Sequence, residues 1–583
     1  QAAFRAQNPC LFQNGSSYAR KENAYVFDFD PARTLTIFEK FANDLSSDTS
    51  AGRGDLETRK AHIKELLNFF PVIGEDENGE LIELDAEKVL TIPRKIRSVE
   101  VVRRGFMSNF LFQNISQVFS APQAIIDIIS KFEPVDEQKG NVNFSEEVKE
   151  DLSLNDEGEV DVPDKIIIGA ANDVFGDKIF APTEDVNSTI SEIVDTPEKA
   201  TSALDKLKSN THSQMTANIL AEAKNSYGSE MKPSDKRKLE SRINGAADNL
   251  IDKSFKHYTI DKNTIEQERA EALQSRHETG RSTTEIDQEF DKKIKEATEQ
   301  FQETLKTGLE ELVEESKKDV VKTVETNKRE REKSVIEEGI RDHLRGFSRT
   351  IPSFLMAYGD NEVTLATFDT VIPDTVFKEV TSITLEQFRL LRDGGPYPDP
   401  ETGEEKEFKG NLFDPVVFDD SVKEFLALKK KLADYFDEKS VEDIFDYIPP
   451  QKTNQIFTPK AMVKKMVDML EEENPGCFDL PDKTFIDLYM KSGLYIAEIV
   501  KRLYQSDKMK NLYPDKYDRL KHIFEKQVYG LAPTEIIYKI ATSYILGFDE
   551  DVKITRHNFK LLDALPYAKN ETLKEKLDEI YGE

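Results

Sequence analysis

The sequence predicts an α-rich protein of several domains that ends in an α/β domain with a parallel sheet. Its 583 residues are several times the roughly 150 residues of a typical domain. Residues 260–344 are rich in Glu and Lys and carry a helical pattern of apolar residues. From residue 454 onward, short apolar strands alternate with helices, which is typical of parallel strands joined by helical connections.

The composition limits the location of the protein and its partners. Hydrophobic residues make up 38% of the chain and include 36 Phe and 18 Tyr, which indicates packed cores. The two cysteines, Cys10 and Cys477, are too few for a disulfide framework or a zinc site, so we expect a reducing cytoplasm. No apolar run is long enough for a membrane helix, and we expect no membrane partner.

The net charge of −31 predicts that the chain as a whole repels polyanions. Contact with nucleic acid must therefore come from a local basic patch or from a bound partner. One interpretation of the densest basic cluster is contact with a double-stranded DNA backbone, and the other is ion pairing with acidic neighbours. This cluster consists of Arg94, Lys95, Arg97, Arg103 and Arg104.

Five segments are expected along the chain: the end of an α/β lobe at 1–48, a helical domain with the basic cluster at 55–132, an acidic insert with helices at 133–259, a long helical coupler at 260–392, and a nucleotide-binding type of α/β domain at 411–583. Between Glu133 and Lys199 there are 19 acidic and 5 basic residues, which indicates a solvated insert or, alternatively, a DNA-mimicking surface. An apolar stripe on the coupler indicates packing against neighbouring helices or, alternatively, an oligomer interface. The stripe is formed by Phe290, Ile294, Ala297, Phe301, Leu305, Leu309 and Leu312.

The last segment contains the residues with expected chemistry. An apolar strand, Thr484–Leu488, carries Asp487 near its end and leads through the turn residues Ser492 and Gly493 into a helix. A strand, a turn of small residues and a helix N-terminus together bind the phosphates or polar groups of nucleotide and nucleoside cofactors. No nucleophilic triad and no metal-ligand spacing emerges, so no metal is expected in this segment.

Several features of the last segment occur together: Phe457-Thr458-Pro459 before a helix, the acid-ended strand with its Ser-Gly turn, Tyr529-Gly530, and a later strand that ends at Asp563. Over about Asn454 to Asp563 this combination resembles the S-adenosylmethionine-binding half of adenine-specific DNA methyltransferases, which is a Rossmann-like domain. It is similar to the domains fused to helicases in Type I-like and single-polypeptide (Type ISP) restriction-modification enzymes.

The resemblance implies a role for each matching residue. Phe457, Thr458 and Pro459 would line the methionine side of the cofactor. Asp487, Ser492 and Gly493 would hold its amino-acid moiety, and Asp563 would approach the adenine ring. Two departures accompany the match. Leu531-Ala532-Pro533 stands where the family has an acid for the ribose, with Glu535 nearby, and the turn Tyr489-Met490-Lys491-Ser492-Gly493 is bulkier than the family's usual loop of small residues.

The chain also lacks the Asn-Pro-Pro-Tyr or Asp-Pro-Pro-Tyr motif that grips a flipped adenine. We therefore expect this portion to be inactive alone, with that motif on a separate methyltransferase or specificity subunit or elsewhere in a longer chain.

The amino terminus resembles a second family. Gln1 to Pro9 is similar to the last conserved motif of DEAD/DEAH-type helicase and translocase motors, whose second lobe is RecA-like. The resemblance implies that Arg5 acts as an arginine finger on ATP, with magnesium, in a complete motor. Together the two resemblances predict part of an ATP-dependent restriction-modification enzyme that translocates on DNA and methylates adenine. The alternatives are a non-catalytic acidic helical scaffold and a DNA mimic.

Overall fold

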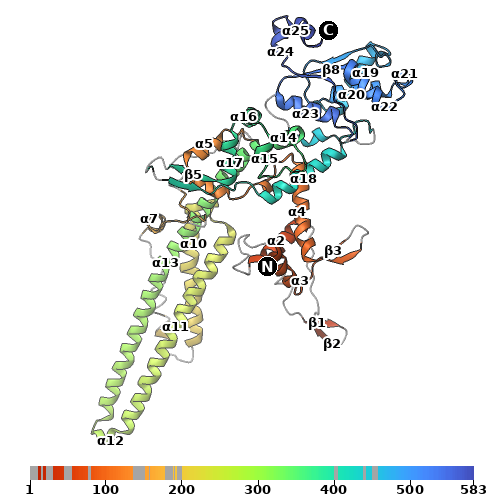
Figure 1. The fold of residues 1–583 in the computed structure, drawn as a ribbon. Coiled ribbons are helices and arrows are strands. Elements are labelled where there is room, and N and C mark those ends of the chain that lie inside the picture. Colours follow the sequence, from red (N-terminus) through yellow and green to blue (C-terminus); the bar gives the residue numbers. More distant parts are fainter. Residues whose placement is uncertain are drawn as a thin grey trace. The chain divides into compact units, whose positions relative to one another are not determined.

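The computed structural model describes residues 11–14, 17–20, 31–44, 56–75, 80–135, 152–155, 158–176, 188, 191–193, 200–398, 403, 405–437, 442–449, 457–549 and 551–582. The chain divides into two compact units (Figure 1). Unit 1 comprises residues 1–142 and 338–583, and unit 2 comprises residues 143–337. The prediction of a helix-rich protein with more than one structural unit is confirmed.

Unit 2 is built around a long antiparallel pair of helices, α11 and α13 (Figure 1). Its described helices are α7 (Asp164–Phe175), α9 (Ala200–Thr211), η5 (His212–Thr216), α10 (Ala217–Tyr227), η6 (Gly228–Glu230), α11 (Pro233–Gln274), α12 (Arg276–Thr279) and α13 (Thr283–Ser348), the last of which continues into unit 1. The helical stretch expected over 260–344 is therefore interrupted. The chain reverses next to Gly280, whose φ of +68° favours glycine.

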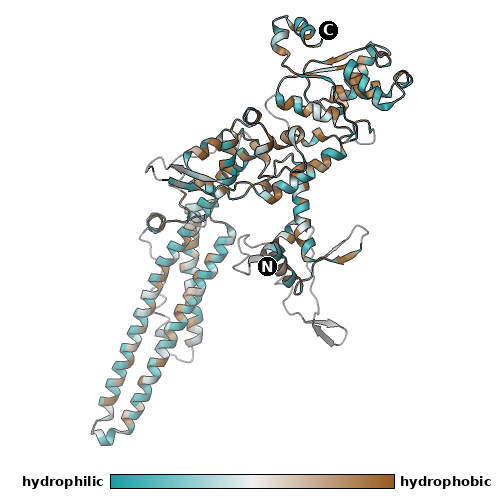
Figure 2. Ribbon diagram, viewed as in Figure 1, coloured by the Kyte–Doolittle hydropathy of each residue, from teal (hydrophilic) through white to brown (hydrophobic). Residues whose placement is uncertain are grey.

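The apolar stripe of α13 packs against α11 of the same chain. The ring of Phe301 stacks on Tyr258 with centroids 4.9 Å apart, and Leu305 and Leu309 are buried in the same cluster. Gly308 permits a close approach, because a Cβ there would lie 2.8 Å from Leu250 Cδ1. Packing within the chain thus accounts for the stripe, while hydrophilic residues dominate the rest of the hairpin (Figure 2).

The first part of unit 1 consists of helices and short antiparallel hairpins. Its described elements are β1 (Leu11–Asn14), β2 (Ser17–Arg20), α2 (Pro31–Asp44), α3 (Leu56–Leu67), β3 (Ile73–Glu75), β4 (Leu81–Glu83), α4 (Ala86–Arg103), η2 (Asn109–Leu111), η3 (Ile115–Ser120) and α5 (Gln123–Ser130). The side chain of Asp85 caps α4 by accepting a hydrogen bond from the N–H of Lys88 at 2.8 Å. The apolar run Tyr25–Phe29, which is typical of a buried strand, lies outside the described residues.

The middle of unit 1 has an aromatic core. Phe347, near the end of α13, stacks on Phe388 with centroids 5.4 Å apart, and Phe354 stacks on Phe377 at 5.5 Å. The surrounding elements are α14 (Ile351–Tyr358), α15 (Phe368–Val371), α16 (Asp374–Thr381), α17 (Leu385–Asp393), β5 (Gly395–Pro398), β6 (Glu405–Phe408), α18 (Pro415–Lys431) and η7 (Ile444–Tyr447). The long helical coupler expected over 260–392 is divided here, because α13 ends at Ser348 and α14 begins with a proline in its first turn.

The last part of unit 1 contains a three-stranded parallel sheet in the order β7-β8-β9. The strands are β7 (Phe485–Asp487), β8 (Val528–Ala532) and β9 (Asn558–Leu561). Their register places Ile486 beside Tyr529 and Tyr529 beside Asn558. Helices precede, connect and follow the strands: α19 (Lys460–Glu473), η8 (Cys477–Asp479), α20 (Leu494–Gln505), α21 (Asp507–Leu512), α22 (Lys516–His522), η9 (Ile523–Gln527), α23 (Glu535–Leu546), α24 (Leu565–Lys569) and α25 (Leu573–Tyr581).

The α14 helix joins the aromatic core to this sheet domain. Tyr358 at its end donates a hydrogen bond to Glu535 Oε1 of α23 at 3.4 Å. Lys429 of α18 donates from Nζ to the carbonyl oxygens of Leu355 (3.3 Å) and Met356 (3.0 Å) at the end of α14. Burial lowers the pKa of this lysine to about 8.

Lys429 is expected to give stability a distinct pH dependence. Between pH 8 and the usual lysine pKa of about 10.4, the unfolded chain binds more protons than the folded chain. The free energy of unfolding should therefore rise with pH in this window, by up to about 1.4 kcal/mol per pH unit relative to Lys429→Met. Urea denaturation followed by tyrosine fluorescence measures the free energy of unfolding at each pH. Lys431→Met, on an exposed residue of the same helix, is the control, and identical pH profiles for both variants would contradict the assignment.

Candidate functional site

The carboxyl end of β7 carries a half-buried acid, Asp487. Asp487 Oδ1 accepts a hydrogen bond from the N–H of Tyr489 at 2.9 Å, and no ion pair to it occurs among the described residues. Burial raises the pKa of the Asp487 carboxyl, although the Tyr489 N–H acts in the opposite direction. A carboxylate in this position is poorly solvated, so a cationic or hydroxyl group that approaches it gains a strong interaction.

The turn after Asp487 leads into α20 through Ser492 and Gly493. Ser492 is buried, and its Oγ accepts a hydrogen bond from the N–H of Leu494 at 3.3 Å. Gly493 is the N-cap of α20 with φ +87°, a left-handed conformation that favours glycine. A Cβ at Gly493 would lie 2.8 Å from Ile545 Cγ1 and 3.2 Å from the oxygen of Ala541. The turn therefore rests directly on the last turns of α23.

Phe445 connects Phe457 to the same part of α23. Its ring packs on Phe445 with centroids 4.9 Å apart, and Phe445 packs edge-on against Tyr544 at 4.9 Å. Tyr544 is adjacent to Ile545, which touches Gly493. Thr458 is half-buried, and Pro459 is the N-cap residue of α19. The α23 helix thus brings the Phe-Thr-Pro segment and the Ser-Gly turn to one region.

Asp443 is a buried residue in this region that sequence reasoning missed. Its Oδ1 accepts from the N–H of Phe445 at 3.0 Å, and its Oδ2 accepts from the hydroxyl of Tyr544 at 3.3 Å. Burial raises the pKa of the Asp443 carboxyl, while these hydrogen bonds and the charge of Lys460 act in the opposite direction. Only its spacing before the Phe-Thr-Pro segment could have indicated it, because nothing local marks Asp443 as buried.

The other predicted positions lie after β8 and β9. Since parallel strands have their carboxyl ends at one edge, Asp563 after β9 belongs to the same edge as Asp487. Its Oδ1 accepts from the N–H of Leu565 at 3.0 Å. Glu535 is occupied by its hydrogen bond from Tyr358 of α14. Thr534 Oγ1, at the start of α23, is buried without a hydrogen-bond partner among the described residues.

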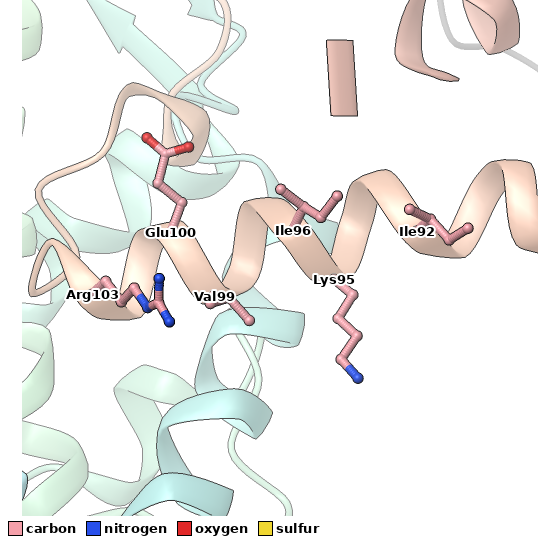
Figure 3. Close-up of a pocket in the computed structure, with 6 residues that line it drawn as sticks. All are labelled: Ile92, Lys95, Ile96, Val99, Glu100 and Arg103. Atoms are coloured by element: carbon pink, nitrogen blue, oxygen red, sulfur yellow. The ribbon is translucent and has the colours of Figure 1, made fainter. Parts of the chain in front are cut away.

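The basic cluster on α4 separates into paired and unpaired residues. Arg94 forms an ion pair with Asp420 at 3.0 Å, Arg97 donates to Thr36, and Arg104 pairs with Glu100 at 3.2 Å. Lys95 and Arg103 form no ion pair with a described residue. Both lie on a face of α4 that lines a cavity of about 400 Å³ (Figure 3). The residues lining it are Ile92, Lys95, Ile96, Val99, Glu100 and Arg103.

The remaining expectations concern the arginine finger, metal ions and membranes. Arg5 lies outside the described residues. Within the described ranges, His, Cys, Asp and Glu form no group of three or more that could hold a metal ion. The described helices are all too short or too polar to cross a membrane.

A comparison with known proteins relates part of the chain to one class of enzyme. The chain is 26% identical over 129 residues to an uncharacterized adenine-specific methylase of Mycoplasma pneumoniae. The matched segment covers 22% of this chain and 30% of that relative. No protein-family model matches the chain, and no solved structure matches it significantly. The similarity supports a methyltransferase relationship over that segment.

Gly493→Ala should destabilise the sheet domain by about 2–4 kcal/mol, since it adds a conformational cost of about 1 kcal/mol to an overpacking cost of about 1–3 kcal/mol. Gly476→Ala is the matched control. Gly476 also has a positive φ, +74°, but the nearest atom to its Cβ would be 3.9 Å away, so only the conformational cost applies. Urea denaturation followed by circular dichroism measures both, and equal losses would show that the contact with Ile545 is unimportant.

Proposed function

We propose that residues 457–563 bind S-adenosylmethionine and belong to an adenine-specific DNA methyltransferase. The observation that carries the proposal is the arrangement at the carboxyl edge of β7: a half-buried Asp487 that has no ion-pair partner among the described residues, followed by a glycine turn at the N-terminus of α20. The packing of Phe457 on Phe445, which in turn contacts Tyr544 in the same part of α23, supports it. The similarity to an adenine-specific methylase supports the methyl-transfer chemistry.

The residues of this region suit the two ends of the proposed cofactor. The carboxylate of Asp487 would bind the ammonium group of the methionine moiety, and the positive N-terminal end of α20 would favour its carboxylate. Phe457, Thr458 and Pro459 would line this side, and Asp563 would approach the adenine ring. S-adenosylmethionine supplies an electrophilic methyl group when bound. The protein residues named here orient the cofactor and do not activate the target amine.

The proposed enzyme is larger than the region that carries the cofactor site. The chain spans about 30% of the length of the methylase that it matches. We place the target-adenine motif on a separate methyltransferase or specificity subunit or on another part of a longer chain. The resemblance at Gln1–Pro9 supports the finer proposal of a translocase of the Type I-like or Type ISP restriction-modification class. In such an enzyme Arg5 would act on ATP, with magnesium, and the enzyme would translocate along double-stranded DNA.

Asp487→Asn is expected to abolish cofactor binding and to raise the free energy of unfolding at neutral pH. The folded-state pKa of Asp487 is raised, so ionising this carboxyl costs stability above its unfolded pKa, and the neutral amide avoids that cost. The Tyr489 N–H can still donate to the amide oxygen. Isothermal titration of the full chain with S-adenosylmethionine, together with urea denaturation, measures both effects.

The exposed Asp482→Asn, in the loop before β7, is the control for the change in charge.

Cofactor affinity of the unaltered chain should also weaken as the pH falls through the raised pKa of Asp487, which lies above that of an ordinary Asp. No binding by the unaltered chain, or equal binding by Asp487→Asn, would refute the proposed function in favour of a packing role for this domain.

Lys95 and Arg103 are expected to carry most of the α4 contribution to DNA binding, because the other three cations have partners within the chain. The double variant Lys95→Ala/Arg103→Ala should reduce the magnitude of the salt slope of log K by about 2. Fluorescence anisotropy with a duplex at 50–200 mM salt measures the slope. Lys464→Ala/Lys465→Ala, on exposed residues of α19, changes the net charge equally, and the same slope in both variants would contradict the assignment.

A further inference from the structure

Met490 is enclosed between the turn that follows β7 and the middle of β8. Its side chain is completely shielded from solvent, with 0% exposed. Its N–H donates to the carbonyl oxygen of Leu531 at 2.8 Å, which ties the turn to β8. The side chain lies flat across Gly530: a Cβ at Gly530 would be 2.9 Å from Met490 Cε, 3.0 Å from Cγ and closer still to Sδ.

Gly530 is required by this contact rather than by its backbone conformation. The positive-φ glycines do not include Gly530, so another residue could adopt its backbone angles. The obstacle is steric: Cβ contacts under 3.0 Å essentially never occur in folded proteins, so a Cβ at Gly530 would force the Met490 side chain to shift. Residues 490 and 530 therefore form a matched pair, in which the missing side chain of one makes room for the thioether of the other.

The turn is thus held between two contacts. On β8, Met490 lies across Gly530, and on α23, Gly493 rests against Ile545 and the oxygen of Ala541. Ser492 lies between these contacts in the sequence, and Asp487 lies shortly before Met490 at the end of β7. A shift of the Met490 side chain would change the distance of the turn from β8 and would tilt both residues.

We propose that Met490 is a positioning residue for the cofactor site, which sets the height of the Asp487–Gly493 turn above β8. The inference rests on the proposed function described above. A methionine suits this role, because its unbranched and polarisable side chain fills irregular space. If Met490 merely blocked space that the ligand needs, shortening its side chain would tighten binding. If Met490 positions the turn, shortening its side chain weakens binding.

The test combines four variants: Met490→Leu, Met490→Ala, Gly530→Ala and the double variant Met490→Ala/Gly530→Ala. Met490→Ala and Gly530→Ala should each raise the Kd for S-adenosylmethionine roughly tenfold, because the turn is displaced. Met490→Leu should stay close to the unaltered chain. The double variant should bind better than Gly530→Ala alone, because removal of the thioether makes room for the new methyl group.

Isothermal titration of the full chain gives the Kd values, and hydrogen exchange of the amides at 489–494 reports on the turn without cofactor. The inference predicts faster exchange and weaker binding in both single variants, with both effects reduced in the double variant. An unchanged Kd despite faster exchange, an unchanged exchange rate, or tighter binding by Met490→Ala would each overturn it. Absence of binding by the unaltered chain would instead overturn the proposed function, and this inference with it.

Discussion

The sheet domain depends on the close approach of the β7–α20 turn to its neighbours. Gly493 and Gly530 have no side chain where α23 and Met490 come too near for a Cβ. A Cβ at Gly493 would push the turn away from α23, and a Cβ at Gly530 would displace the Met490 side chain that lies against β8. The position of Asp487 and the start of α20 both follow from this constraint, since one precedes and the other follows the turn.

The same packing explains why Asp487 is costly for the fold. Asp487 is half-buried, desolvation raises the pKa of its carboxyl, and among the described residues the carboxyl accepts a hydrogen bond from a single backbone N–H, that of Tyr489. A domain that only had to pack would gain stability from an apolar or neutral residue in this place. Acids with a perturbed pKa are typical of binding and catalytic sites, which is why this residue carries the proposed function.

The secondary structure near the site was predictable because its signals are local. The strand expected at Thr484–Leu488 is β7 at Phe485–Asp487, and the helix expected after Gly493 begins at Leu494. An apolar run and a glycine turn mark both in the sequence. The reversal between α11 and α13 was missed, because the polar residues around Gly280 look like the rest of an exposed helix.

The contacts that shape the site could not be predicted in this way. Met490 touches Gly530, and Asp443 bonds Tyr544, which lies 101 residues away along the chain. Helical or strand periodicity reports which residues are buried, whereas it does not identify the partner of a buried residue. The pairing of Arg94 with Asp420 is another example, since only the fold distinguishes it from the exposed Lys95.

The most direct test of the account is a crystal structure of the protein with S-adenosylhomocysteine, the product form of the proposed cofactor. The account predicts density at the carboxyl edge of β7, with the amino group near Asp487 and the amino-acid end next to Gly493 and Phe457. A structure that stays empty there at saturating ligand, or that binds the ligand elsewhere, would contradict it.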